Sequence, residues 1–184
     1  MDNIQKFFNW FSSSQKKDKN VFQSSPIRGF EHSLPMELLK AREAAMIRFR
    51  SMLRNHGLTE QQWRVIRTLA AYKKMDTGEL AKRSLLLSPS LTRILQFLEK
   101  ENIVHRSSDS TDQRRFVFKL TTKGHNLFEE VAPDAEKLYF EIEQSFGTEK
   151  LQQLYALLAD FSNNLSNNIN MSEDNTAVID NPEL

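Results

Sequence analysis

In one short stretch of this chain the spacing of the apolar residues changes, and that change limits the folds that it can adopt. Between residues 34 and 98 apolar side chains recur every three or four positions, which is typical of amphipathic helices. Between residues 116 and 120 they alternate with other side chains, which is typical of a β-strand. The helical spacing returns after Thr121. The sequence therefore predicts a mainly α fold with a small β-hairpin.

Capping signals mark where several helices begin. Ser33 and Pro35 are typical of a helix start, and Thr59 with Gln62 three residues later resembles a capping box. The patterns predict four helices, which cover residues 34–57, 59–72, 76–84 and 88 to beyond 98. Asp76 and Ser88 are the start signals of the last two. Two more helices are expected to include 127–142, with a kink at Pro133, and 151–165.

The two expected strands are Ile103–Ser107 and Phe116–Leu120. Their connection, 108–115, is long, polar and charged, so we expect it to project from the body as a flexible loop. The resulting order is ααααββαα. A short helix, a second helix and a basic two-stranded wing in succession predict a winged helix-turn-helix.

Both ends of the chain lack the pattern of a packed core. Residues 1–33 are rich in Ser, Gln, Lys and Asn, and we interpret them as a flexible N-terminal arm. Ile4, Phe7, Phe8 and Phe11 stand at helical spacing in this arm, which predicts a short amphipathic helix that docks on the protein itself or on a partner. Residues 167–184 are polar and are expected to form a disordered tail. One domain over 34–166 remains.

Charge is distributed unevenly along the chain although its net charge is only +1. Residues 72–123 carry 11 Lys and Arg against 6 Asp and Glu, whereas residues 124–184 carry 2 against 12. A basic middle beside an acidic C-terminal part is suited to binding a polyanion, although acidic helices are also simply well solvated.

Several functional classes are disfavoured by the composition. The chain has no cysteine, which excludes a disulfide scaffold, a thiol nucleophile and an iron–sulfur cluster. The four histidines have no neighbours at ligand spacing, so no metal or other cofactor is expected, and no catalytic motif is recognisable. With neither a long apolar span nor a signal sequence, the protein is expected to be cytoplasmic, with no membrane partner.

The predicted helix that begins at Ser88 has one apolar and one polar side. Its polar side carries arginine, glutamine and hydroxyl groups, which are the groups that recognise DNA in the major groove and hold phosphates. The same residues also fit an ordinary solvated helix surface, and the wing that follows makes the DNA interpretation more specific. An arginine on the wing can enter the minor groove, and an aspartate can orient it. The predicted DNA-binding residues are Ser88, Ser90, Thr92, Arg93, Gln96, Arg106, Asp112, Arg114 and Arg115.

From about Leu34 to Leu165 the sequence resembles the MarR family of bacterial transcriptional regulators. The motifs that carry the resemblance are Gly78–Ala81, Ser88–Leu95, Leu98–Val104, Asp112–Arg115 and Leu120–Gly124. Through Ala41–Met46 and Leu58–Arg64 it is most similar to the HpaR type, the regulators of homoprotocatechuate and 4-hydroxyphenylacetate degradation. The family often has glycine where this chain has Asn102, which can take the same left-handed conformation.

The resemblance implies a homodimer that is held together by the first, fifth and sixth helices and reads an inverted-repeat operator. The DNA-binding part would be about 58–123. It further implies a repressor of aromatic-acid catabolic genes, released when a small aromatic carboxylate such as a hydroxyphenylacetate binds near the first helix. The candidate effector residues are Arg42, Met46, Phe49, His56, Trp63 and Arg67. Several of these residues fit equally well a role in the core or at a helix end.

Two other functional classes remain open on the sequence alone. A winged helix can also serve as a protein-interaction or RNA-associated module, in which Arg114 and Arg115 would face a partner. An enzyme is the third alternative, although no recognisable catalytic motif supports it.

Overall fold

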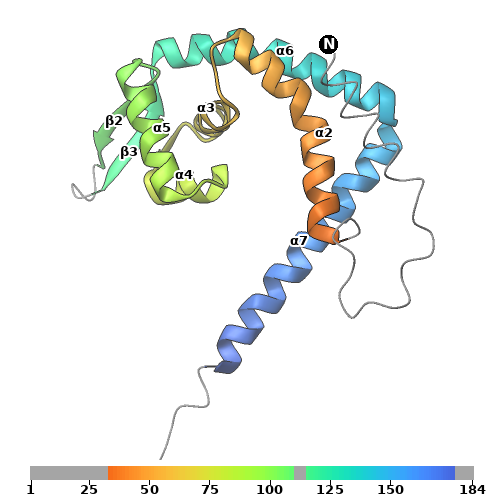
Figure 1. Cartoon of the computed structure of the whole chain (residues 1–184). Coiled ribbons are helices and arrows are strands. Elements are labelled where there is room, and N and C mark those ends of the chain that lie inside the picture. The colour runs from red at the N-terminus through yellow and green to blue at the C-terminus, as the bar shows by residue number, and fades with distance from the viewer. Residues whose placement is uncertain (1–32, 110–114, 177–184) are drawn as a thin grey trace, which may run out of the picture. The chain divides into compact units, whose positions relative to one another are not determined.

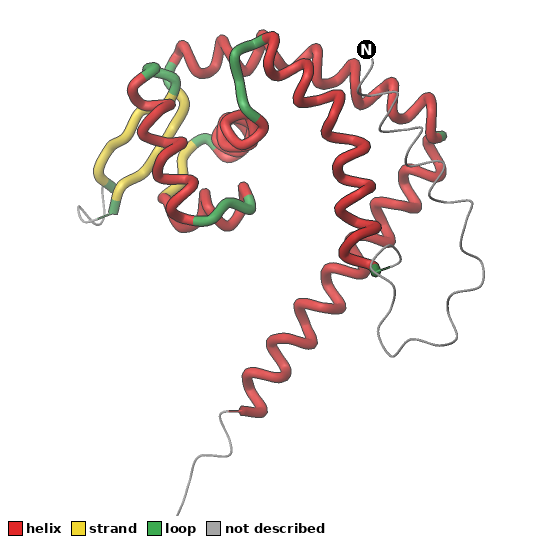
Figure 2. Tube along the Cα trace, in the orientation of Figure 1, coloured by secondary structure: helices red, strands yellow, loops and turns green. Residues whose placement is uncertain are grey.

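The computed structural model of the chain describes residues 33–109 and 115–176 (Figure 1). Its elements are, in order, α2 (Leu34–Asn55), α3 (Glu60–Tyr72), β1 (Lys74–Asp76), α4 (Thr77–Ser84), α5 (Ser88–Lys100), β2 (Val104–Ser108), β3 (Phe116–Leu120), α6 (Thr122–Phe146) and α7 (Thr148–Thr176). Helices dominate, as Figure 2 shows, so the predicted mainly α class with a small β part is confirmed. Two compact units are present, Met1–Ala135 and Glu136–Leu184.

The helices begin where the capping signals predict them. Thr59 and Gln62 form the expected capping box, with the Gln62 N–H donating to Thr59 Oγ1 at 3.2 Å and the Thr59 N–H donating to Gln62 Oε1 at 2.8 Å. Asp76 caps α4 by accepting the Glu79 N–H at 2.9 Å. Helix α5 does begin at Ser88, but its capping position is Leu87, which offers no side-chain cap. The predicted start at Ser88 is therefore confirmed, although the helix has no side-chain cap.

The β part is a three-stranded antiparallel sheet in the order β1-β3-β2 rather than a hairpin alone. Strands β2 and β3 form the predicted hairpin, with Val104 opposite Leu120 and Ser108 opposite Phe116. The unpredicted strand β1 pairs Met75 with Phe118. It has only three residues, too few for an alternating pattern, and its last residue, Asp76, is also the cap of α4. The loop tip, residues 110–114, lies outside the described residues.

A close approach joins the wing to α6. Asn102 has φ = 57°, the left-handed conformation that we expected of it in place of glycine. The Thr121 N–H then donates to the Ile103 carbonyl at 3.0 Å, and the Gly124 N–H donates to Thr121 Oγ1 at 3.0 Å. A Cβ atom at Gly124 would lie 2.2 Å from the Ile103 carbonyl oxygen. Only glycine allows α6 to begin this close to the chain before β2.

The core of the first unit is built from one apolar side of each helix. The apolar side chains with at most 1% exposure are all aliphatic, namely Leu53, Val65, Ile66, Leu69, Leu80, Leu91, Leu98 and Val131. They come from α2, α3, α4, α5 and α6, so this core sets where α5 presents its opposite side.

The two C-terminal helices are longer than the sequence suggested. Pro133, where we expected a kink, lies inside the continuous helix α6. The backbone of α7 is helical to Thr176, which corrects the expectation of a disordered tail for residues 167–176, while 177–184 lie outside the described residues. No helix in the described ranges is long and apolar enough to span a membrane.

The Gly124→Ala variant tests the close approach at the start of α6. We expect it to lower the free energy of unfolding by about 1–3 kcal/mol, because the added methyl group collides with a backbone carbonyl that cannot move freely. Gly78→Ala is the matched control, since its Cβ would meet Asp76 Oδ1 at an ordinary 3.4 Å. Chemical denaturation measures both, and equal stabilities of the two variants would contradict the proposed constraint.

Candidate nucleic-acid interface and neighbouring pocket

Helix α5 exposes a polar side and buries an apolar one. Leu91, Leu95 and Leu98 are at most 3% exposed and anchor the helix to the core. The side chains predicted to read DNA are all exposed, namely Ser88, Ser90, Thr92, Arg93 and Gln96. Thr92 donates its hydroxyl hydrogen to the Ser88 carbonyl at 2.9 Å, whereas no ion pair is recorded for Arg93 within the described residues. The Arg93 guanidinium therefore has its donors available for another molecule.

Arg106 and Phe116 of the wing lie beside α5. The Arg106 guanidinium carbon lies 3.5 Å above the centre of the Phe116 ring, a cation–π contact between β2 and β3. Both residues line a hollow of about 150 Å³ together with Thr92 and Gln96 of α5. The helix and the wing thus present one continuous surface. Phe116 was not among the predicted site residues, because the alternation of β3 marked it only as a strand residue.

Arg115 is held at the loop end of the wing, next to the first residue of β3. It forms an ion pair with Asp76, the cap of α4, and its carbonyl accepts the Asp109 N–H at 2.8 Å. The backbone N–H of Glu79 and the nearby Arg115 charge lower the pKa of Asp76. Asp112 and Arg114 lie outside the described residues, so the predicted pairing of Asp112 with an arginine stays a prediction. Asp76 is the partner that the structure gives to Arg115, and it was missed because it lies 39 residues away.

A row of basic side chains crosses one side of the sheet. Lys74 lies opposite Lys119, which lies opposite His105, and all three are exposed. The like charges of Lys74 and Lys119, directly opposite each other, repel, so this arrangement favours an anionic partner. The row was not predicted, because it depends on the pairing of the unexpected strand β1.

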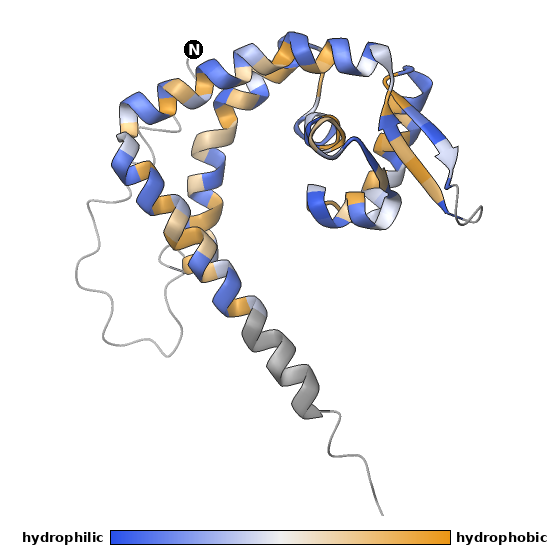
Figure 3. Cartoon of the chain, turned by 180° about the vertical axis from the view of Figure 1, so that it is seen from behind, coloured by the Kyte–Doolittle hydropathy of each residue, from blue (hydrophilic) through white to orange (hydrophobic). Residues whose placement is uncertain are grey.

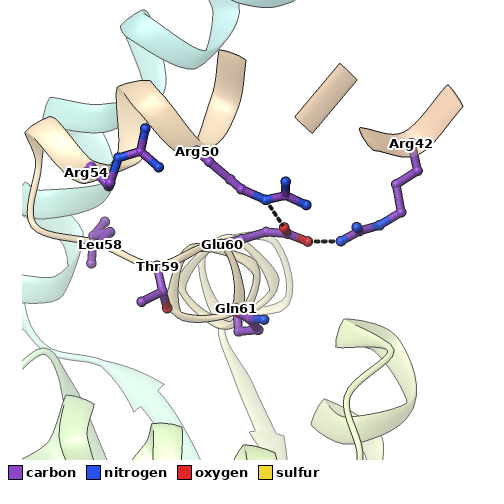
Figure 4. Close-up of a pocket in the computed structure, with 7 residues that line it drawn as sticks. All are labelled: Arg42, Arg50, Arg54, Leu58, Thr59, Glu60 and Gln61. Carbon is purple, nitrogen blue, oxygen red and sulfur yellow. Dashed lines mark hydrogen bonds and ion pairs between the residues drawn. The ribbon is translucent and has the colours of Figure 1, made fainter. Parts of the chain in front are cut away.

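A second polar cavity, the α2–α3 pocket, has a volume of about 370 Å³ and is drawn in Figure 4. Its lining residues are Arg42, Arg50, Arg54, Leu58, Thr59, Glu60 and Gln61. The three arginines come from α2, and they face the N-terminal end of α3. No ion pair is recorded for Arg54 within the described residues. This pocket is suited to a small anion.

Glu60 is the buried charge of the α2–α3 pocket, with a side chain only 8% exposed. Its carboxylate is paired with Arg42, with Arg50 at 3.1 Å and with Arg64 at 2.5 Å. Burial by itself raises the pKa of Glu60, but the Arg50 hydrogen bond and the charges of Arg42, Arg64 and Arg50 outweigh it and lower the pKa. Arg50 also donates two hydrogen bonds to Glu43, at 2.6 and 2.8 Å. Glu60 is thus an ionised carboxylate that is compensated from two helices.

The six candidate effector residues are not brought together around this pocket. Of them only Arg42 lines it. Phe49 and Trp63 are buried in the core, where the Trp63 ring stacks on Phe128 at 5.6 Å between centres. Trp63 Nε1 is buried and has no hydrogen-bond partner among the described residues. Met46 is half-buried on α2, and Arg67 is exposed on α3.

His56 has a structural partner set of its own. It caps the C-terminal end of α2, and its ring nitrogens lie 3.2 Å from Glu130 Oε1 and 2.8 Å from Asp134 Oδ2 on α6. Its assignment to an effector site is therefore not supported by these contacts. Arg50, Arg54 and Glu60 were missed from the sequence. The seven-residue spacing of Glu43 and Arg50, which places both on one side of a helix, was the available signal.

Within the described parts of the chain, no group of three or more His, Cys, Asp or Glu residues is arranged to hold a metal ion.

Comparison with known proteins gives matches over most of the chain. Residues 58–116 match the model of the MarR family. The chain is 45% identical to the homoprotocatechuate degradative operon repressor of Escherichia coli, over 70% of this chain and 87% of that protein. It is 42% identical to the HTH-type transcriptional regulator FarR of Neisseria gonorrhoeae, over 74% and 94%. The crystal structure of NadR in complex with 4-hydroxyphenylacetate superposes with a TM-score of 0.65 at 42% identity, over 74% of this chain and 97% of that one.

The His56 contacts predict a pH-dependent stability. The hydrogen bonds to Asp134 and Glu130 outweigh burial and raise the pKa of His56 above its usual 6.5. A raised pKa in the folded state means that the stabilisation is fully present below the unfolded pKa and is lost as pH rises through the folded one. We therefore expect His56→Gln to lower the free energy of unfolding more at pH 5.5 than at pH 8.5. Urea denaturation at both pH values measures this, and an effect independent of pH would contradict it.

Proposed function

This chain belongs to the MarR family of transcriptional regulators, and we propose that it is a homodimeric repressor of aromatic-acid catabolic genes, released from its operator by a small phenolic carboxylate. The observation that carries the proposal is the 45% identity with the homoprotocatechuate degradative operon repressor, together with an exposed reading helix attached to a basic wing. The matched relatives are regulators, and we propose that this chain likewise has no catalytic activity and acts in the cytoplasm.

DNA is read by α5 and the wing in this proposal. Arg93 and Gln96 have the hydrogen-bonding groups for guanine and adenine edges in the major groove. Ser88, Ser90 and Thr92 are suited to phosphates, and Arg106 and Arg114 to the minor groove. Arg115, which is paired with Asp76, is assigned to holding the wing in place. The basic row of Lys74, Lys119 and His105 adds attraction for the phosphate backbone.

A second copy of the chain is the proposed cover for the exposed apolar residues of α2, α6 and α7. Figure 3 shows hydrophobic residues along each of these helices. The large ones that are more than a third exposed are Leu34, Leu38, Leu39, Phe140, Phe146, Leu154, Tyr155, Leu157, Leu158 and Leu165. Exposed apolar surface of this extent is typical of an interface. A two-fold dimer would also match an inverted-repeat operator.

The effector is proposed to bind with its carboxylate in the α2–α3 pocket. Arg54, which forms no ion pair within the described residues, supplies one guanidinium there, and Arg42, which is paired with Glu60 and Glu43, supplies another. Guanidinium groups bind carboxylates through paired hydrogen bonds. The complex of the relative NadR with 4-hydroxyphenylacetate suggests this ligand as the probe.

The DNA-reading proposal predicts a specific loss in the Arg93→Ala variant. We expect this variant to bind the inverted repeat of the chain's own upstream region more weakly by about 1–3 kcal/mol, with a smaller loss on random DNA. Lys150→Ala, on exposed α7, is the control for removing one positive charge. Fluorescence anisotropy at several salt concentrations provides the affinities. Equal binding of wild type to operator and random duplexes would instead favour a protein-interaction or RNA-associated module.

The effector proposal predicts that 4-hydroxyphenylacetate weakens operator binding by roughly 5- to 150-fold, the usual range of coupling between two sites. The same ring without a carboxylate, as in 4-methylphenol, should have little effect. Arg54→Gln should raise the concentration of 4-hydroxyphenylacetate that is needed, whereas Lys150→Gln should not. Titrations of operator-bound protein provide this comparison. Release by both compounds alike, or equal sensitivity of the two variants, would contradict the carboxylate site.

A further inference from the structure

The turn between α4 and α5 is held in an unusual backbone conformation. Leu85 has φ = 51° and ψ = 48°, the left-handed region that is unfavourable for a leucine, because its Cβ comes too close to the following carbonyl oxygen. Its side chain is 83% exposed, so packing of that side chain does not offset the cost. Helix α5 begins only three residues later, at Ser88. Whatever fixes this turn therefore also fixes how the reading helix leaves α4.

Arg64 is the side chain that holds the turn. Its Nη1 group donates to the Ser84 carbonyl at 3.2 Å and makes a longer contact with the Leu85 carbonyl at 3.5 Å. The last carbonyls of a helix have no partner within the helix, so a guanidinium at this end also suits the helix dipole. Arg64 comes from α3 and thus ties the turn to the core of the first unit.

The same guanidinium is also attached to the α2–α3 pocket. Its Nη2 group donates to Glu60 Oε1 at 2.5 Å, and the Glu60 carboxylate is shared with Arg42 and Arg50 of α2. One continuous set of charged hydrogen bonds therefore runs from the pocket through Glu60 and Arg64 to the turn before α5. Arg50 and Arg64 are both cations, and the Glu60 carboxylate is the partner that they share.

We propose that Arg64 is a positioning residue for the reading helix, and that Glu60 couples it to the arginines of the α2–α3 pocket. A buried carboxylate must keep its cationic partners, because an unpaired buried charge is strongly unfavourable. If an anion in the pocket draws Arg42 or Arg50 away, Glu60 relies more on Arg64. Arg64 then has less of its guanidinium for the two carbonyls, and the strained turn loses its support.

The inference rests on the proposed DNA-binding function, but its test needs no effector. The affinities of wild type, Arg64→Gln, Arg50→Gln and the double variant are measured for the operator and for a random duplex. We expect Arg64→Gln to lower the ratio of operator to random affinity about tenfold, because hydrogen bonds from a charged group are lost at the turn. The control Lys82→Gln removes an exposed charge from α4 and should leave the ratio unchanged.

Coupling through Glu60 is measured by a double-mutant cycle, which compares wild type, the two single variants Arg64→Gln and Arg50→Gln, and the double variant. If Glu60 connects the two arginines, the ratio in the double variant should differ at least about twofold from the product of the single effects. Arg64→Lys keeps the charge but not the forked geometry, and it should recover only part of the ratio. If the glutamine variants fail to fold, they should also lose binding to random DNA. The cycle is then measured with lysine at positions 50 and 64 instead.

The outcomes separate the two levels of the proposal. A wild-type protein that does not prefer its operator contradicts the proposed function itself. A normal wild-type preference that persists in Arg64→Gln contradicts Arg64 as a positioning residue. If the effects of the Arg50 and Arg64 variants on that preference are independent, only the coupling through Glu60 is contradicted, and Arg64 remains a positioning residue.

Discussion

The buried carboxylate of Glu60 is the interaction on which the arrangement of the first unit depends. A charge taken out of water is tolerated only when nearby groups compensate it, and here the compensation comes from α2 and from α3 itself. Replacing such a network by apolar residues is often neutral or stabilising in proteins, so its presence argues for geometry rather than for stability. The geometry in question is the placement of α2, α3 and the turn before α5 relative to one another.

The reading surface is organised on the same principle, with cations that are held in place before any partner arrives. Arg106 rests on the Phe116 ring, and Arg115 is paired with Asp76 at the cap of α4. A long side chain that is already restrained loses less conformational freedom when it binds. Arg93, by contrast, forms no ion pair within the described residues, and in the proposed function it is the arginine that contacts the bases.

What could be predicted from the sequence was local, and what could not was formed between distant segments. The capping box of Thr59 and Gln62 and the left-handed Asn102 depend on a few neighbouring residues, and both were predicted. Strand β1 was missed because three residues carry no periodicity and Asp76 already served as a capping signal. The pairs Arg115–Asp76 and Arg42–Glu60 join residues 39 and 18 positions apart. A single sequence does not show which distant carboxylate an arginine will pair with, so neither pair was predicted. The predicted effector set stays a prediction, since Phe49 and Trp63 have the same spacing whether they line a pocket or fill a core.

Helix α5 begins at Ser88, and the residue at its N-cap position, Leu87, offers no side-chain cap. The first N–H groups of a helix have no internal acceptors, and most helices satisfy some of them with a serine, threonine or aspartate oxygen. Here that position is left open at the end of the helix that faces the proposed partner. A phosphate oxygen of the DNA backbone would complete the helix there, with a negative charge placed at the positive end of its dipole. The DNA would then supply the hydrogen-bond acceptor that the first turn of α5 lacks, and the helix would be better ordered on DNA than in solution.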